Sequence, residues 1–368
     1  MALMFAVRSY FGKRIASSSK PEWINGLYKT ALLDMLIPPC GLVAARSTIG
    51  ICEMSYNSLS DVVKAVKEAT RAYESTEPKE LHDIRTGTFA VGTNNQYFTN
   101  LDFVNGMLRD QSMYTWYPLL LTFQDERFTL EQCCALVHRF DYAYSNYLRY
   151  SGLQEMGAFA EAITKHLPTT SSREEAVEAV KAFLGYLNRL AAWSFHYFPW
   201  SIGKHLTYET PEGSIAALAD LSRRVKINEG QKVRLTWQPL GISVIAYLAT
   251  KENPELCNDL IEALPFTVVQ DHAVVSGESM YAWAPVVSTS PVHVKERQCD
   301  APVGRIRYSQ GTGNKVIVQY GEVTEDIATP VLGEILPQYA EDLAKVGQAV
   351  LESNFGDKTP IMLTVELA

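Results

Sequence analysis

The spacing of apolar residues changes once along this chain, near Lys226, and this change constrains the fold more than any other feature. Before it, apolar residues recur every three or four positions; Val62, Val66 and Ala69, for example, share one face of a predicted helix over 59–75. After it, short runs rich in β-branched and aromatic residues alternate with turn signals, which is typical of strands. The sequence therefore predicts a helical first part and a β-rich last part.

Helix starts in the first part have capping residues. Thr129-Leu-Glu-Gln132 has the residue types of a capping box and opens a predicted helix that runs to about residue 150. Ser172-Arg-Glu-Glu175 opens another, which Pro199 ends. Shorter helices are expected at 26–36, 100–109, 152–166 and 214–224. We therefore expect a helical bundle domain over residues 1–225.

The last part reads as many short strands with only two helices. The helices are expected at 254–263, where Asn253 precedes Pro254 as an N-cap, and at 337–354. Strands are expected within 227–250 and at 266–271, 279–283, 303–309, 315–320 and 361–367. This arrangement predicts a small closed or nearly closed barrel as a second domain, residues 226–368.

Charge and cysteine usage limit the classes of function. The 368 residues carry a net charge of −8, which argues against a nucleic-acid-binding protein because phosphate groups need a basic surface. The six cysteines form no C-x-x-C pair, and no apolar run reaches the length of a membrane span. Residues 1–23 lack the apolar core and cleavage site of a secretion signal, so we do not expect secretion. We expect a cytoplasmic protein with reduced thiols and neither nucleic acid nor membrane as a partner.

Motifs for nucleotides, metals and activated nucleophiles are missing from the sequence. Gly311-Thr-Gly313 lies between two predicted strands, lacks a third glycine and opens no helix, so it predicts a hairpin loop and not a dinucleotide site. There is no G-x-x-x-x-G-K-[ST], no G-x-S-x-G and no H-E-x-x-H motif. We expect neither a cofactor nor a metal.

One polar segment of the last part has the residue types of a chemical site, His272-Ala-Val-Val-Ser-Gly-Glu278, with Tyr281 just beyond it. Gly277 permits a tight turn or bulge there, where backbone N–H groups can meet a carboxylate. Strand alternation would place Ser276 and Glu278 on one face and Gly277 and Tyr281 on the other. The alternative is a purely structural bulged hairpin with a surface glutamate.

Two clusters in the helical part combine arginine with aromatic residues. Arg109 is followed by Tyr114 and Trp116, which could together line a pocket for an anionic aromatic ligand. Arg139 lies in a similar cluster with His138. Core packing is the alternative for both, and the arginines are the better candidates for binding carboxylates because their planar fork matches that geometry.

The β-rich part resembles a cyclophilin-like barrel. The segments that carry this resemblance are Asn253-Pro-Glu-Leu, Leu264-Pro-Phe266, His272–Tyr281, Tyr320-Gly-Glu-Val-Thr-Glu325, Gly333 and Val346-Gly347. Joined to a helical bundle, in which Thr99–Trp116 and His138–Tyr150 contribute, the chain resembles the cucumopine and mikimopine synthases of opine metabolism. The fold class we expect is α+β, an N-terminal helical bundle followed by a small cyclophilin-like β-barrel.

The resemblance implies a reaction that needs no hydride. L-Histidine and 2-oxoglutarate would form an imine, and the imidazole ring carbon would then close a six-membered ring in a Pictet–Spengler-type step. We expect Glu278 to be the base, with His272 and Tyr281 as proton donors or orienting groups. Ser276, Gly277, Arg109, Tyr114, Trp116 and Arg139 are the expected substrate-binding residues. The partners are these small molecules, with a homo-oligomer as an option.

Three other functions stay open on the sequence. The barrel could be a non-catalytic or isomerase-like module that binds peptides, although residues 226–368 hold no convincing equivalent of the arginine and aromatic groove of prolyl isomerases. The chain could be a sensor of small carboxylates whose bundle transmits ligand occupancy. An NADH-dependent opine dehydrogenase is disfavoured by the missing glycine-rich turn.

Overall fold

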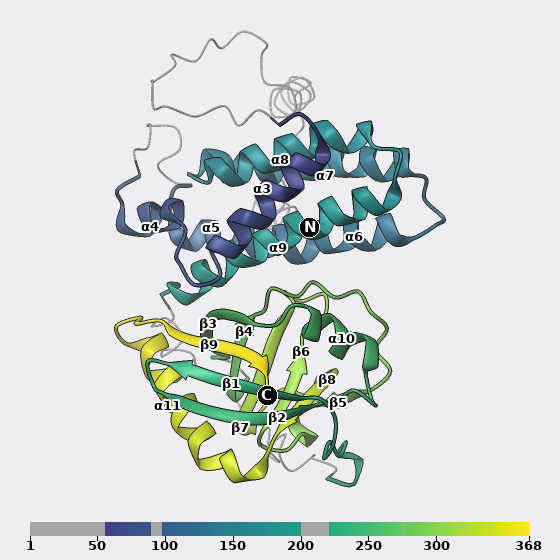
Figure 1. The fold of residues 1–368 in the computed structure, drawn as a ribbon. Coiled ribbons are helices and arrows are strands. Elements are labelled where there is room, and N and C mark those ends of the chain that lie inside the picture. Colours follow the sequence, from purple (N-terminus) through teal and green to yellow (C-terminus); the bar gives the residue numbers. More distant parts are fainter. Residues whose placement is uncertain (1–55, 90–97, 200–220, 275) are drawn as a thin grey trace, which may run out of the picture. The chain divides into compact units, whose positions relative to one another are not determined.

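A computed structural model of the chain describes residues 56–89, 98–199, 221–274 and 276–368 (Figure 1). The helices expected at 26–36 and over most of 214–224 lie outside these ranges. Met54–Ala368 forms one compact unit, which contains the helices and the barrel. The predicted division at residue 225 stays a prediction.

The first part is a helical bundle arranged around α9. Its elements are α3 (Leu59–Ala72), α4 (Lys79–Thr86), α5 (Leu101–Asp110), the π-helix η1 (Gln111–Trp116), α6 (Tyr117–Gln124), α7 (Leu130–Tyr150), α8 (Gln154–His166), the 3-10 turn η2 (Leu167–Thr169) and α9 (Arg173–His196). The helix α9 is buried along most of its length and packs against α3, α5, α6 and α8. The bundle is therefore built around one central apolar helix.

The capping predictions for α7 and α9 are confirmed, whereas Asn253 precedes α10 without a side-chain capping bond. Thr129 and Gln132 form a complete capping box at the start of α7, in which the Thr129 hydroxyl accepts from the Gln132 N–H and the Gln132 side chain accepts from the Thr129 N–H. Ser172 caps α9 by accepting from the Glu175 N–H. Each cap satisfies backbone donors that have no partner inside the helix.

The π-helix η1 is a feature that helical periodicity does not predict. The chain stays helical through it, but the residues that follow point to a different face of the helix. Asp141 of α7 holds it in place: one carboxylate oxygen accepts from the Gln111 amide at 2.7 Å, the Trp116 indole at 3.0 Å and the Ser145 hydroxyl. Burial raises the pKa of Asp141 to about 6. Met113, in the middle of η1, faces the cavity described below.

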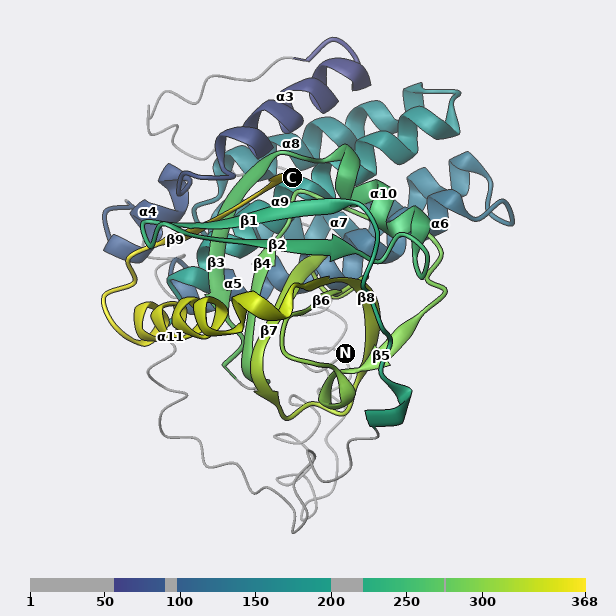
Figure 2. The ribbon, with the colours of Figure 1, turned by 60° about the horizontal axis from the view of Figure 1, so that its bottom comes forward.

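The second part is an antiparallel barrel of eight strands, closed by pairing of β2 with β8 (Figure 2). The order around it is β2-β1-β9-β3-β4-β7-β6-β8, and the short strand β5 pairs with β8 outside this ring. The strands are β1 (Lys232–Gln238), β2 (Ile242–Leu248), β3 (Phe266–His272), β4 (Gly277–Trp283), β5 (Lys295–Arg297), β6 (Arg305–Tyr308), β7 (Lys315–Val323), β8 (Ala328–Ile335) and β9 (Ile361–Leu367). The predicted α+β architecture, helices followed by a closed barrel, is confirmed.

Two helices pack on the apolar core of the barrel. They are α10 (Pro254–Glu262), through Leu256 and Leu260, and α11 (Ala340–Phe355), through Leu343, Val346 and Val350. Strand alternation sends Met280 and Ala282 of β4 into this core. The same alternation sends the side chains between them to the outer face, where the site lies.

A second apolar core joins that outer face to the bundle. It contains Val269, Tyr281 and Trp283 of the barrel together with the apolar residues of the helices. Polar contacts cross the same boundary: the Arg189 guanidinium of α9 donates to the Trp283 carbonyl, and His196 Nδ1 lies 2.8 Å from Asp271 Oδ1. The bundle therefore packs directly on β3 and β4.

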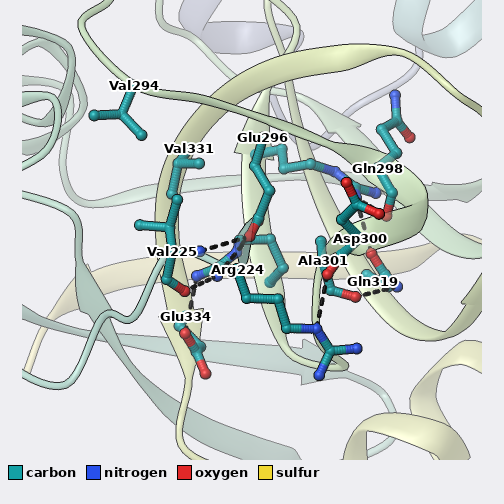
Figure 3. A network of polar contacts seen from close by, with 12 residues as sticks. Arg224, Val225, Val294, Glu296, Gln298, Asp300, Ala301, Gln319, Val331 and Glu334 are labelled. Atoms are coloured by element: carbon teal, nitrogen blue, oxygen red, sulfur yellow. Dashed lines mark hydrogen bonds and ion pairs between the residues drawn. The ribbon is translucent and has the colours of Figure 1, made fainter. Parts of the chain in front are cut away.

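The segment that enters the barrel is fixed by a network of polar contacts that includes Val225, Glu296 and Glu334 (Figure 3). The buried Arg305 joins these three residues. The Arg305 guanidinium binds Glu296 at 2.7 Å and Glu334 at 2.9 Å and donates to the Val225 carbonyl at 2.6 Å. Arg224 donates to the Asp300 carbonyl at 2.8 Å. Residues 224–225 are thus hydrogen-bonded to the barrel wall.

None of the helices in the described ranges is long and apolar enough to cross a bilayer.

Candidate functional site

A cavity of about 410 Å³ lies between the outer face of the barrel and the bundle. Met113 of η1 and Phe195 of α9 line it from the helical side. The barrel contributes the rest of its lining: His272, Ala273, Val274, Ser276, Ser279, Tyr281, Gln298, Ser309, Thr312, Lys315, Ile317, Glu325, Ile327 and Thr329. Three residues of the predicted site, His272, Ser276 and Tyr281, therefore meet in one cavity.

Cross-strand pairing explains which side chains line this cavity. Tyr281 of β4 pairs with Ile317 of β7, and Trp283 pairs with Lys315, so these side chains project from the same face of the sheet. The hairpin between β6 and β7 bends over them; it is the loop predicted from Gly311-Thr-Gly313. Gly313 has φ +99°, and a Cβ there would lie 2.6 Å from the Trp283 ring and 2.8 Å from Lys315 Cε. A side chain at this position would displace Trp283 or Lys315.

Lys315 is the most unusual group of the cavity. Its Nζ lies 4.8 Å from the centroid of the Trp283 ring, 4.9 Å from that of Tyr281 and 5.8 Å from that of Phe195. Within the described residues no hydrogen bond or ion pair engages this ammonium. Burial, with a contribution from the charge of Arg109, lowers the pKa of Lys315 to about 8.

Several buried polar atoms around the cavity have no hydrogen-bond partner among the described residues. They include Ser279 Oγ, Thr329 Oγ1 and His272 Nδ1, all of residues that line the cavity. Arg307 lies one strand away, beside Ile317, and its Nε and Nη2 are also unpartnered. Burial lowers the pKa of Arg307 to about 10. Because unpaired buried polar groups cost free energy, this set indicates a place where a polar ligand binds.

Glu325 is the carboxylate that lines the cavity. Its charge raises the pKa of both Lys315 and Arg307 against the effect of burial, so it lies within electrostatic range of both cations. Within the described ranges no hydrogen bond or ion pair engages it. It belongs to the segment Tyr320–Glu325 that carries part of the family resemblance. This carboxylate is therefore available to a ligand in the cavity.

His272 lies against Tyr320 at the edge of the cavity. Its Nε2 is 2.8 Å from the Tyr320 hydroxyl oxygen. Burial lowers the pKa of His272 to about 4, although the charge of Glu278 acts in the opposite direction, and burial raises the pKa of Tyr320 to about 12. Both groups are neutral at pH 7. His272 is thus a neutral donor or acceptor there.

The bulge predicted at Gly277 is confirmed by a register shift between Gly277 and Ser279. Gly277 has φ +86°, and a Cβ there would lie 2.5 Å from the Glu322 carbonyl oxygen. The bulge changes the expected strand faces, because Ser276 and Tyr281 line the same cavity while Glu278 points elsewhere. Glu278 is exposed, and its Oε2 already accepts from the Glu322 N–H at 2.8 Å. The structure does not bring this glutamate to the cavity.

The residues singled out in the helices do not line the cavity either. Trp116 is fully buried and donates to Asp141, which makes it a core residue. Tyr114 is 67% exposed, although its neighbour Met113 does line the cavity. Arg109 pairs with Asp110 and acts on the cavity only through its charge, and Arg139 is exposed on α7.

A larger cavity, of about 660 Å³, opens at the ends of α4, α5 and α9. Its cations are already engaged: Arg85 pairs with Glu77 and stacks on the Tyr197 ring, and the Lys358 ammonium donates to the Phe198 carbonyl. Fewer free polar groups therefore face it than face the cavity around Lys315. Within the described residues no cluster of three His, Cys, Asp or Glu side chains could hold a metal ion.

Comparison with known proteins points to one family. No curated protein matches the chain in sequence. Among solved structures, McbB in complex with tryptophan is 27% identical over 37% of this chain and 44% of its own, with a TM-score of 0.34, so this chain spans less than half of the McbB chain. The hypothetical protein AF2241 from Archaeoglobus fulgidus is 15% identical over 38% of this chain and 98% of its own, with a TM-score of 0.27.

A family model gives the more informative match. Residues 59–197, which cover α3 to α9, match the cucumopine synthase C-terminal helical bundle domain. The domain that this family model calls C-terminal precedes the barrel in the present chain. Through this bundle, the chain is similar to the cucumopine synthase family over residues 59–197.

Proposed function

We propose that this protein condenses L-histidine with 2-oxoglutarate, through an imine and a Pictet–Spengler-type ring closure, to cucumopine or mikimopine without a redox cofactor. The observation that carries the proposal is one cavity that combines the Lys315 cation, hydroxyls and the Glu325 carboxylate, which have no hydrogen-bond partners among the described residues, next to a bundle similar to that of the cucumopine synthases. The reaction needs each of these groups.

The substrates bring three carboxylates, which cations and hydroxyl donors would bind. Lys315 supplies positive charge in the cavity and Arg307 adds positive charge from the neighbouring strand, while Ser279 and Thr329 supply hydroxyls without partners in the described residues. Ser276 at the cavity edge is a further donor. The Phe195 and Tyr281 rings offer apolar surface on which an imidazole ring can stack.

Ring closure also needs proton transfer. A base must take the proton from the imidazole carbon after it attacks the imine, and Glu325 is the carboxylate available in the cavity. A neutral His272, hydrogen-bonded to Tyr320, can orient the carbinolamine as it loses water. Glu325 therefore takes the role that the sequence suggested for Glu278, with His272 retained.

The test is to mix the pure protein with L-histidine and 2-oxoglutarate, without reductant, and to record the mass of the product. We expect a compound equal in mass to both substrates minus one water. Absence of product, together with thermal stabilisation of the protein by 2-oxoglutarate, would reject the synthase and favour a carboxylate sensor. Oxaloacetate and pyruvate in place of 2-oxoglutarate test which 2-oxo acid the cavity prefers.

A further inference from the structure

We propose that Lys315 is a covalent catalyst, which forms a Schiff base with the keto carbon of the 2-oxo acid before the amine of the second substrate arrives. The identity of the keto acid rests on the proposed function, whereas the covalent step rests on the surroundings of Lys315. No motif in the sequence marks this lysine, which lies in the ordinary strand run Lys315–Tyr320.

The Lys315 amine is accessible from the cavity. Lys315 lines the cavity, and its ammonium is not committed to any hydrogen bond or ion pair with a described residue. Lysines whose role is structural usually pair with a carboxylate or a carbonyl, as Lys358 does with the Phe198 carbonyl. The Lys315 amine is thus available to a ligand in the cavity.

Three aromatic rings form a cage around the Lys315 amine. Trp283, Tyr281 and Phe195 surround Nζ at the distances of cation–π contacts. Such a cage stabilises a protonated Schiff base as well as an ammonium, because both are cations. It also keeps water away from the iminium carbon, which limits unproductive hydrolysis.

The protonation state of Lys315 also favours a Schiff base. A Schiff base forms only from the neutral amine, and with its pKa at about 8 roughly a tenth of Lys315 is neutral at pH 7, against well under a thousandth for an ordinary lysine. Three charged groups act on this pKa: Arg109 lowers it, and Asp271 and Glu325 raise it. The surroundings thus retain enough of the neutral form to react.

The step balances without any further reagent. The Nζ lone pair attacks the keto carbon, the keto oxygen takes a proton, and loss of water gives the iminium. The histidine amine then adds to the same carbon, and Lys315 leaves as a free amine after proton transfer. The outcome is the substrate imine that the ring closure requires, reached through two steps with lower barriers.

Reductive trapping tests the proposal on the full chain. We expect incubation with 2-oxoglutarate and cyanoborohydride to add the mass of the acid less one oxygen atom, and peptide mapping to locate the adduct on Lys315. Lys315→Met should abolish it. Lys358→Met is the matched control, because the pKa of Lys358 is also lowered to about 8 but its ammonium donates to a carbonyl outside this cavity. The Lys358→Met variant should form the same amount of adduct as the wild type.

Lys315→Arg keeps the charge and removes the nucleophile, so a folded Lys315→Arg protein with at least about a 100-fold loss of turnover supports the proposal. Absence of a wild-type adduct, an adduct that persists in Lys315→Met, or full turnover in Lys315→Arg would overturn it. Product formed from histidine without any trapped Lys315 leaves the proposed function standing and removes the covalent step. A Lys315 adduct without product supports the covalent step and contradicts the proposed function.

Discussion

At the scale of single residues, two glutamates near β4 differ in what their carboxylates already do. Glu278 accepts a backbone N–H at the bulge and is exposed, whereas Glu325 lines the cavity with no partner in the described residues. We therefore expect Glu325→Gln to lower turnover by about 100-fold or more, since an amide cannot take the ring proton. Steady-state kinetics with histidine and 2-oxoglutarate measure this.

Glu278→Gln is the control for that experiment. Its amide oxygen can still accept from the Glu322 N–H, so we expect turnover within about two-fold of the wild type. If Glu278→Gln were the inactive variant and Glu325→Gln the active one, the base would be the residue first suggested by the sequence.

His272 makes stability depend on pH. Its pKa is about 4 in the folded protein, lowered from the usual 6.5 by burial, so below pH 6.5 the unfolded chain binds a proton that the folded chain does not. The stability contributed by neutral His272 is complete above pH 6.5 and is lost as the pH falls towards 4, by about 3 kcal/mol. Urea unfolding of the wild type and of His272→Asn at pH 7 and pH 4.5 measures this loss. Between pH 7 and pH 4.5, the free energy of unfolding should fall more for the wild type than for the variant.

Part of the site could be predicted at this scale and part could not. His272, Ser276 and Tyr281 lie close in sequence around one glycine, and a local pattern was enough to find them. Lys315 and Arg307 come from the strands β7 and β6, and Glu325 from the connection between β7 and β8, so only the order of strands in the closed barrel brings them together. The spacing of these residues in the sequence does not predict that they lie close together, nor that burial lowers the pKa of Lys315 and of Arg307.

At the scale of elements, the bulge at Gly277 links the fold to the site. Gly277→Ala would force a side chain onto a residue with φ +86° and within 2.5 Å of the Glu322 carbonyl oxygen. We expect a loss of about 3 kcal/mol in the free energy of unfolding, measured by urea denaturation. Because the bulge sets the position of Ser276, the Michaelis constant should rise as well.

Gly241→Ala separates backbone strain from the clash. Gly241, at the β1–β2 turn, also has a positive φ, +67°, but no atom lies within 4 Å of the position that a Cβ would take there. We expect a loss of about 1 kcal/mol and unchanged kinetics. Equal losses in both variants would mean that the contact with Glu322 contributes nothing.

Elements with strong local signals were predicted well. Helices with a capping residue and strands with β-branched runs have the expected places, because propensity and periodicity act within a few residues. The strand β8 was not predicted, since Pro330 and Gly333 interrupt its sequence; its pairing with β2, β5 and β6 stabilises it instead. The π-helix η1 was missed for the same reason, because Asp141, distant in sequence, holds it.

At the scale of the whole molecule, the bundle forms part of the cavity and also supports its opposite wall. Met113 and Phe195 line the cavity from the helices, while Arg189 of α9 donates to the carbonyl of Trp283, the cross-strand partner of Lys315. Arg189 is completely buried, and burial lowers its pKa to about 10. Burying the Arg189 cation in this apolar contact costs free energy, so we expect its hydrogen bond to the Trp283 carbonyl to matter for the fold.

Arg189→Met should therefore loosen the barrel wall and leave most of the bundle intact. We expect amide hydrogen exchange in residues 277–283 and 315–323 to accelerate by about 10-fold, because these strands lose their anchor to α9. Arg173→Met is the matched control: Arg173 also lies on α9, but it donates to the Phe123 and Phe128 carbonyls inside the bundle. In Arg173→Met, amide hydrogen exchange in the barrel strands should not change. Equal acceleration in both variants would show that general destabilisation, and not the bond to Trp283, transmits the effect, and the cavity wall would then be held by the barrel alone.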